Sequence, residues 1–197
     1  MSSLAHKNPL RPEDYLALER LATGRSEYHD GRIYAMAGAS RVHGLLAANL
    51  SRHLGNQFDD RGCELYIADM RVSVEATGLY AYPDIAIICG TPSFLDGKFD
   101  TLLNPTVIIE VLSPSTESWD RGGKFAHFRR IESLTDYVLV SQDKILVEHY
   151  TRQGEQWLLT AWSRPADSLV IDSIGCSVPL ADIYARVTFD PDQTSAT

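Results

Sequence analysis

Residues 82–88, YPDIAII, and residues 106–112, TVIIEVL, are two apolar runs that decide the fold. Short runs rich in Ile and Val, bounded by proline and loop residues, are typical of strands that a sheet buries on both faces. Each run carries one acid, Asp84 or Glu110. Because Asp and Glu are almost never fully buried unless paired or bound to a metal, both carboxylates need partners.

A divalent metal site explains the two carboxylates. Mg²⁺ prefers oxygen ligands, keeps several waters, and is usually held by one or two carboxylates together with a substrate phosphate. Lys124 follows soon after, near the start of a predicted helix. Its ammonium could orient or deprotonate an attacking water, or offset charge on the phosphate. The sequence therefore predicts that Asp84 and Glu110 bind Mg²⁺, with Mn²⁺ as a substitute, beside Lys124.

Each of these residues also has a structural interpretation. Asp84 could cap the turn after Pro83, and Glu110 could pair with an arginine, since ion-pair networks also occupy clefts. Lys124 shares a predicted helix face with Phe128 and Ile131. A lysine on such a face often lays its stem on apolar neighbours and keeps its ammonium in water. The three residues together favour the catalytic interpretation.

A longer motif carries a resemblance to a known family. Residues 110–116 read EVLSPST, and Asp120 and Lys124 follow at a spacing of four. The pattern resembles the Uma-type "putative restriction endonuclease" family within the PD-(D/E)XK nuclease superfamily, and the likeness extends over residues 12–187. In the superfamily the lysine usually stands two residues after the second acid, where this chain has Leu112. In the Uma-type family the lysine has migrated to the next helix, and Lys124 fits that place.

The resemblance implies both fold and function. It implies an α/β fold of the restriction-endonuclease type, with a mixed central sheet flanked by helices and an added antiparallel hairpin. It implies a Mg²⁺-dependent endonuclease that hydrolyses DNA phosphodiester bonds, with Glu27 and His43 as further active-site residues. Restriction-type enzymes often act as dimers that cut both strands, so a homodimer is expected.

Glu27 and His43 each have a simpler alternative. Glu27 lies in a hairpin predicted around Asp30-Gly31, where an acid can simply be exposed. His43 lies in the first turn of a helix predicted from an N-cap at Ser40 to about Phe58. A histidine at the edge of an apolar helical stripe is more often structural than catalytic.

The remaining elements are predicted from periodicity and turn residues. The first is a helix over residues 12–21 with Tyr15, Leu18 and Leu21 in the core, and a loop over 90–104 could serve as a lid or dimer contact. Strands are predicted near 64–68 and 70–74, at 136–140 and, as an edge strand, at 168–171. A hairpin of 145–150 with 156–162 and a helix over 179–186 complete the set. A single domain over residues 11–188 is expected, with flexible tails at 1–10 and 189–197.

Composition sets limits on location and partners. No apolar run reaches the ~18 residues of a membrane span, and the N-terminus lacks a secretory pattern. Cys63, Cys89 and Cys176 form no Cys-x-x-Cys pair, which argues against a disulfide framework or zinc knuckle and favours a reducing cytoplasm. The net charge of −8 counts against nucleic-acid binding. Residues 119–152 nevertheless carry a small positive surplus, which permits phosphate contact.

Two rival functions remain open at this stage. The first is a non-catalytic nuclease-fold module that binds nucleic acid or protein, which the acidic charge and Leu112 favour. The second is a metal-dependent hydrolase of another phosphate ester. Basic side chains lining the cleft around Asp84 would favour DNA over a smaller substrate.

Overall fold

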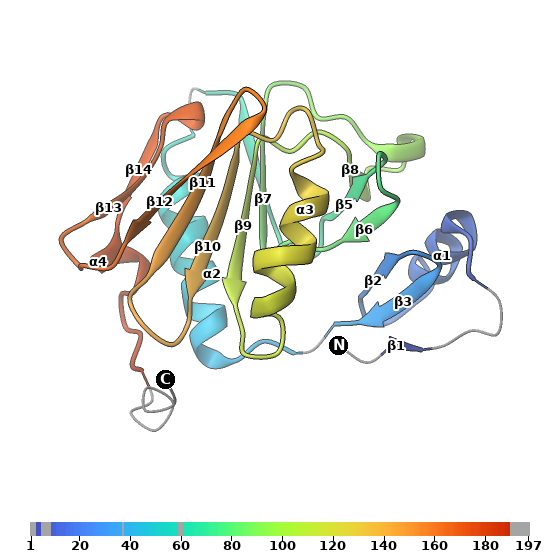
Figure 1. Cartoon of the computed structure of the whole chain (residues 1–197), viewed down its shortest axis with the longest axis horizontal. Helices are drawn as coiled ribbons and strands as arrows, with labels where there is room; N and C mark the ends of the chain where they lie inside the picture. The colour runs from blue at the N-terminus through green and yellow to red at the C-terminus, as the bar shows by residue number, and fades with distance from the viewer. Residues whose placement is uncertain (1–2, 5–8, 37, 59–60, 190–197) are drawn as a thin grey trace.

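The computed structural model describes residues 3–4, 9–36, 38–58 and 61–189, and it has a mixed central sheet of six strands (Figure 1). The strand order is β12-β11-β10-β9-β7-β4. The bounds are β4 Cys63–Ile67, β7 Ile85–Cys89, β9 Val107–Leu112, β10 Asp136–Ser141, β11 Val147–Gln153 and β12 Gln156–Trp162. Strands β9 and β10 are parallel, and the other neighbours are antiparallel. The predicted mixed sheet is therefore confirmed.

Helices cover both faces of the central sheet. Helix α2 (Arg41–Gly55) lies behind it and α3 (Phe125–Phe128) lies in front in the view of Figure 1. Because side chains alternate along a strand, β9 sends Ile109 and Val111 into the core with α2, and Ile108 and Leu112 into the core with α3. Every residue of β9 is buried. Glu110 therefore points to the α3 side.

A second six-stranded sheet has the order β1-β3-β2-β6-β5-β8. Its strands are β1 Ser3–Leu4, β2 Ser26–His29, β3 Arg32–Ala35, β5 Arg71–Val74, β6 Leu79–Ala81 and β8 Thr101–Leu102. The predicted hairpin is confirmed, because β2 and β3 pair around Asp30 and Gly31, whose φ angles are +49° and +74°. Helix α1 (Pro12–Glu19) packs Tyr15 against Tyr28 of β2, with ring centroids 5.0 Å apart.

A small two-stranded unit completes the fold. Strands β13 (Ser168–Ile171) and β14 (Cys176–Pro179) pair antiparallel beside the short helix α4 (Leu180–Ile183). The single-turn helices η1 (Leu95–Gly97) and η3 (Asp172–Ile174) lie in the connections. The hairpin of β11 with β12 is also confirmed. In the segment over 90–104 that was predicted as a loop, β8 pairs in parallel with β5.

The first helix is shorter than predicted. It ends at Glu19, and Leu18 and Leu21 are 50% and 86% exposed, so their assignment to the core was wrong. The buried side chains are Tyr15, Leu16 and Glu19, which form the face turned to β2. The predicted tails fall largely on residues 1–2, 5–8 and 190–197, which lie outside the described part of the chain, so the domain limits stay a prediction.

The cysteine prediction was wrong for one pair. Cys63 and Cys89 form a disulfide across the antiparallel pair of β4 and β7, and Cys176 is a buried free thiol. The strand register places the two cysteines opposite each other although they are 26 residues apart, which spacing alone does not reveal. Unpaired cysteines therefore no longer support a reducing compartment. None of the helices in the described ranges is long and apolar enough to cross a membrane.

The buried pair of Asp136 and His149 stabilises the start of β10. His149 Nε2 lies 2.6 Å from Asp136 Oδ1, and the hydroxyl groups of Thr135 and Ser173 donate to Oδ2. Burial alone would raise the pKa of Asp136, but the hydrogen bonds from His149, Ser173 and Thr135 outweigh it and lower the pKa. The ionised carboxylate therefore stabilises the folded state.

We expect Asp136→Asn to lower the free energy of unfolding at pH 7 by about 3 kcal/mol, because it breaks a buried pair. A lowered pKa stabilises the fold above the unfolded pKa near 4, and this contribution is lost as the pH falls through the folded pKa. The deficit of the variant should therefore shrink below about pH 4. Urea denaturation at a series of pH values measures the free energy of unfolding, and Asp172→Asn, which changes an exposed acid, serves as the control. An equal deficit in both variants would contradict the prediction.

Candidate active site

Strand register brings Asp84 and Glu110 together. Strands β7 and β9 are antiparallel with Ile85 opposite Ile109, so Asp84, one residue before β7, lies beside Glu110. The amide N–H of Val111 donates to Asp84 Oδ2 at 2.7 Å, and the amide N–H of Asp84 donates to Glu110 Oε2 at 3.4 Å. The main chain of each strand thus fixes the carboxylate of the other.

Lys124 reaches the same point from the following helix. It ends the π-helical turn η2 (Trp119–Lys124), which continues into α3, and turns of this type often occur at functional sites. Lys124 is only 4% exposed, and its Nζ lies 2.9 Å from Glu110 Oε1. The prediction that it shares an inward face with Phe128 and Ile131 is confirmed. Its ammonium is buried, so the interpretation of a lysine extending into water was wrong.

Glu27 joins the site from the second sheet. Its Oε1 lies 3.0 Å from Lys124 Nζ and accepts a hydrogen bond from the amide of Tyr82 at 3.3 Å. Glu27 is 4% exposed, so the alternative of an exposed hairpin acid was wrong. The Lys124 ammonium is therefore the link between β9 of the central sheet and β2 of the second sheet.

His43 reaches Asp84 from helix α2, which covers the other face of the central sheet. Ser40 caps α2 as predicted, because its Oγ accepts from the amide of His43 at 3.1 Å. The cap fixes the first turn, and His43 Nε2 lies 3.1 Å from Asp84 Oδ2. Burial lowers the pKa of His43, but the hydrogen bond and charge of Asp84 outweigh it, so the pKa is raised above its usual value. A protonated imidazole is thus favoured beside Asp84.

Asp120 is the residue that the sequence interpretation undervalued. It was not counted among the active-site residues, yet it is 3% exposed and its Oδ1 lies 3.7 Å from Lys124 Nζ. The signal was the spacing of four between Asp120 and Lys124, which places two residues on one helix face. The hydroxyl of Tyr137 donates to the carbonyl oxygen of Asp120 at 2.9 Å and so supports this turn.

The site holds more negative than positive charge. Four carboxylates, those of Glu27, Asp84, Glu110 and Asp120, surround one ammonium and one imidazole. Burial raises the pKa of Glu110 well above its usual range and also raises that of Asp120. Burial opposes the charge of Lys124, but Glu110, Glu27 and Asp120 outweigh it and raise its pKa. The lysine is therefore an ammonium at neutral pH.

The donor set suits a hard divalent cation. Asp84 and Glu110 offer carboxylate oxygens, and both line a cavity of about 750 Å³ together with His43 and Lys124. Apart from the Lys124 ammonium at 2.9 Å, buried Glu110 Oε1 has no hydrogen-bond partner within the described chain. The described residues contain no preformed cluster of three or more His, Cys, Asp or Glu for a metal. The arrangement fits Mg²⁺ held by two carboxylates, with water and phosphate completing its shell.

Comparisons with known proteins agree with this fold. The family model "Uma2: Putative restriction endonuclease" matches residues 12–181. Two uncharacterized proteins of Synechocystis sp. are similar, slr1290 at 35% identity over 91% of this chain and 94% of its own length, and sll1609 at 40% over 81% and 91%. The crystal structure of a "putative nuclease belonging to DUF820" from Anabaena variabilis matches with a TM-score of 0.75 at 18% identity, over 91% of this chain and all of that one. The last likeness concerns the fold alone.

Proposed function

The chain belongs to the Uma2 family of "putative restriction endonucleases", and we propose that it is an endonuclease that hydrolyses DNA phosphodiester bonds with Mg²⁺ or Mn²⁺. One observation carries the proposal. Lys124 comes from the helix after β9, yet its ammonium lies 2.9 Å from Glu110, whose carboxylate accepts from the amide of Asp84. Two carboxylates and one lysine thus meet in one cavity, although Leu112 occupies the usual lysine position.

Asp84 and Glu110 would hold the metal. A bound divalent ion lowers the pKa of its water and neutralises charge on the phosphate, so few further protein groups are needed. The amide of Val111 holds Asp84 Oδ2 in place, and His43 balances the charge of the same oxygen. His43 thereby positions Asp84.

Lys124 would act as a donor of positive charge. The carboxylates of Glu27, Glu110 and Asp120 raise the pKa of Lys124, which favours a charged donor over a general base. It can donate a hydrogen bond to a phosphoryl oxygen or to the attacking water, and such fixed donors stabilise charge that develops in the transition state. Glu27 and Asp120 hold the ammonium in position for this role.

A cleavage assay tests the proposed function. Supercoiled plasmid and single-stranded circular DNA are incubated with the protein and Mg²⁺, Mn²⁺ or EDTA at low salt, where an acidic protein binds DNA best. We expect cutting with either metal and none with EDTA. Absence of cutting on both substrates with both metals would contradict the proposal and favour the binding module. Cutting that persists in EDTA would contradict the metal-dependent mechanism.

Three further properties are proposals. DNA is the proposed partner, and a homodimer would allow both strands to be cut, which the ratio of nicked to linear plasmid reports. The cytoplasm stays the proposed location, although the Cys63–Cys89 disulfide removes the cysteine argument for it. If light scattering shows that the protein is a monomer, nicked plasmid should accumulate before linear plasmid.

A further inference from the structure

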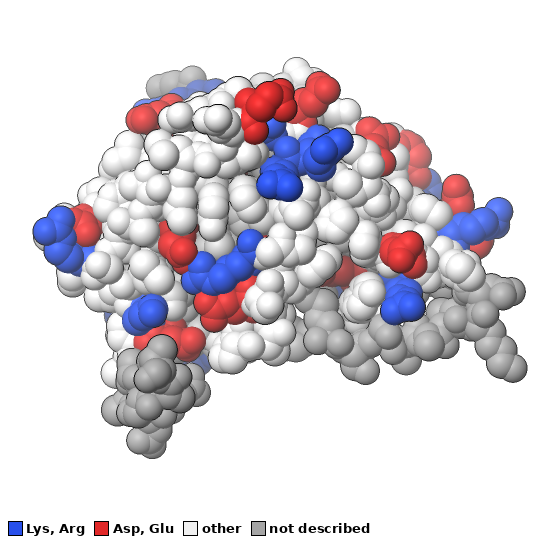
Figure 2. Space-filling view, in the orientation of Figure 1, with Lys and Arg blue, Asp and Glu red and all other residues white. Residues whose placement is uncertain are grey.

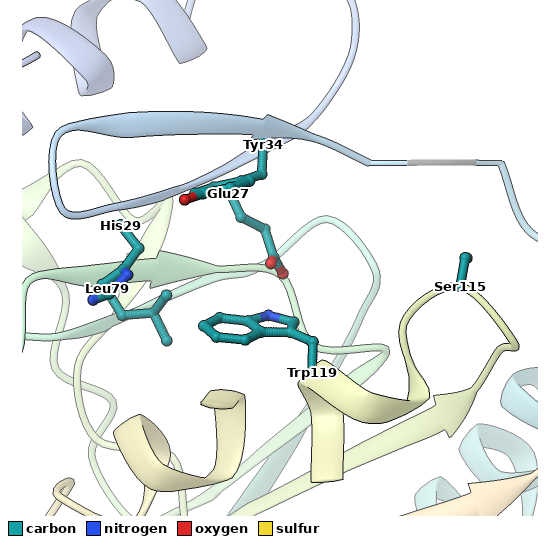
Figure 3. A pocket seen from close by; sticks show the side chains of 6 residues that line it. All are labelled: Glu27, His29, Tyr34, Leu79, Ser115 and Trp119. Atoms are coloured by element: carbon teal, nitrogen blue, oxygen red, sulfur yellow. The ribbon is translucent and has the colours of Figure 1, made fainter. Parts of the chain in front are cut away.

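A second cavity adjoins the proposed active site. It has a volume of about 250 Å³ and is lined by Glu27, His29, Tyr34, Leu79, Ser115 and Trp119 (Figure 3). Glu27 and Ser115 also line the large cavity that contains Asp84, Glu110 and Lys124, so the two cavities meet at these residues. The small cavity is below the ~300–1,000 Å³ of sites for drug-sized ligands, which limits it to about one ring system.

Aromatic rings line much of this cavity. Trp119, His29 and Tyr34 contribute three aromatic rings. A methyl group on Gly123 would come within 2.0 Å of the Trp119 ring, so the indole lies directly against the main chain of η2. His127 packs behind the wall, with its ring centroid 4.4 Å from that of His29 and 5.9 Å from that of Trp119. The indole is therefore held in a fixed orientation.

The carboxylate of Glu27 is the polar group that faces the indole across this cavity (Figure 3). Trp119 Nε1 is buried and has no hydrogen-bond partner within the part of the chain that the structure describes. Figure 3 shows the edge of the indole that carries this nitrogen on the side of the Glu27 carboxylate. The contacts of Glu27 with Lys124 and with the amide of Tyr82 both use Oε1. Oε2 is thus the oxygen that can accept from a base stacked on the indole, whereas the indole N–H lies in the plane of its own ring and cannot donate to that base.

We propose that this cavity binds one unpaired nucleobase of the DNA strand that is cut, stacked on Trp119 and hydrogen-bonded along its edge by Glu27 Oε2. The inference rests on the proposed nuclease function and names its substrate class as DNA with an unstacked nucleotide, such as a single strand or a bulge. Adenine, cytosine and guanine fit better than thymine, because each offers an exocyclic amino group to the carboxylate.

The charge of the protein agrees with an unpaired substrate. Duplex binding depends mainly on phosphate contacts with a basic surface, whereas this chain has a net charge of −8. On the face seen in Figure 2, basic and acidic side chains alternate in small groups rather than forming a basic groove. Stacking on an aromatic ring supplies affinity that does not depend on net charge, and a base must leave the duplex stack to reach it.

A binding measurement without cleavage tests the inference. The probe is a short oligonucleotide with one 2-aminopurine, whose fluorescence responds to stacking, and it is titrated in EDTA either single-stranded or in a full duplex. We expect the single-stranded probe to bind at least about tenfold more tightly, in line with the usual contribution of one stacked base. Equal affinity for the two probes would overturn the inference. Equally tight binding of the free 2-aminopurine nucleotide would also overturn it, because the base would then not be read as part of a strand.

Two glycine variants provide a matched pair. A methyl on Gly123 meets the Trp119 ring, whereas a methyl on Gly122 meets nothing within 4 Å. Gly123→Ala and Trp119→Leu should each weaken binding of the single-stranded probe about tenfold, and Gly122→Ala should bind like the wild type. Unchanged affinity in both Gly123→Ala and Trp119→Leu would overturn the inference.

The nuclease proposal and this inference fail separately. Selective binding of the unpaired probe by a protein that cuts no DNA in Mg²⁺ would support the base site and contradict only the nuclease function. Metal-dependent cutting of duplex and single-stranded DNA at equal rates, with equal probe affinities, would overturn only the base site.

Discussion

Lys124→Met is expected to slow metal-dependent cleavage by about 10²–10³-fold, the usual effect of removing one fixed donor from a transition state. The same change should destabilise the fold, because Glu110, Glu27 and Asp120 then lack their shared buried cation. Breaking a buried ion pair by removing one partner costs about 3–5 kcal/mol. Both effects come from one ammonium that is 4% exposed.

The stability that Lys124→Met loses depends on pH in a definite direction. Burial and repulsion from neighbouring carboxylates raise the folded-state pKa values of Glu110 and Asp120, and removing the ammonium, which lowers them, raises them further. The folded variant then binds more protons than the unfolded chain, so its stability falls as the pH rises above about 4.5. Urea denaturation should find Lys124→Met closer to the wild type at pH 5 than at pH 8.

The exposed Lys144 gives the matched control, because Lys144→Met also removes one positive charge. It should cleave DNA and unfold like the wild type. If Lys124→Met retained wild-type cleavage, the lysine would have no part in the chemistry. If its stability deficit were the same at pH 5 and pH 8, the buried carboxylate cluster would not be its cause.

Asp84→Asn is expected to reduce cleavage by at least about a thousandfold, since a metal ion supplies several kcal/mol of transition-state stabilisation and each 1.36 kcal/mol is tenfold in rate. The fold should survive, because the asparagine oxygen can still accept from the amide of Val111. Far-UV circular dichroism checks the fold. Asp172→Asn, which alters an exposed acid, should leave cleavage unchanged.

Asp84→Asn should also change the pKa of His43. Burial lowers the pKa of His43 and Asp84 raises it more strongly, so removing the carboxylate charge should lower the pKa below that in the wild type. NMR titration of the imidazole measures this directly. An unchanged pKa of His43 would show that the contact of 3.1 Å between Nε2 and Asp84 does not govern its charge.

Much of the site could be predicted because its signals are local. The runs over 82–88 and 106–112 form strands, since apolar residues bury both faces of β7 and β9. Antiparallel pairing then places Asp84 beside Glu110. Lys124 was identified from the family resemblance and its spacing of four from Asp120, and its spacing to Phe128 and Ile131 placed it on the inward helix face. These signals lie within one strand, one helix or one short motif.

The remaining features depend on packing between distant segments. Glu27 is buried because β2 of the second sheet meets η2, and no periodicity within residues 26–29 shows that contact. The Cys63–Cys89 disulfide depends on the register of β4 with β7. Leu18 is exposed because Tyr15, Leu16 and Glu19 form the face of α1 that packs inward, and Leu21 lies beyond the last residue of the helix.

Calorimetric titration with Mn²⁺ tests the metal centre most directly, because it needs neither a substrate nor turnover. We expect the wild-type protein to bind Mn²⁺, Asp84→Asn and Glu110→Gln to lose this binding, and Asp172→Asn to keep it. Absence of Mn²⁺ binding by the wild type, or equal binding by Asp84→Asn and Glu110→Gln, would contradict the assignment of these two carboxylates as the metal ligands.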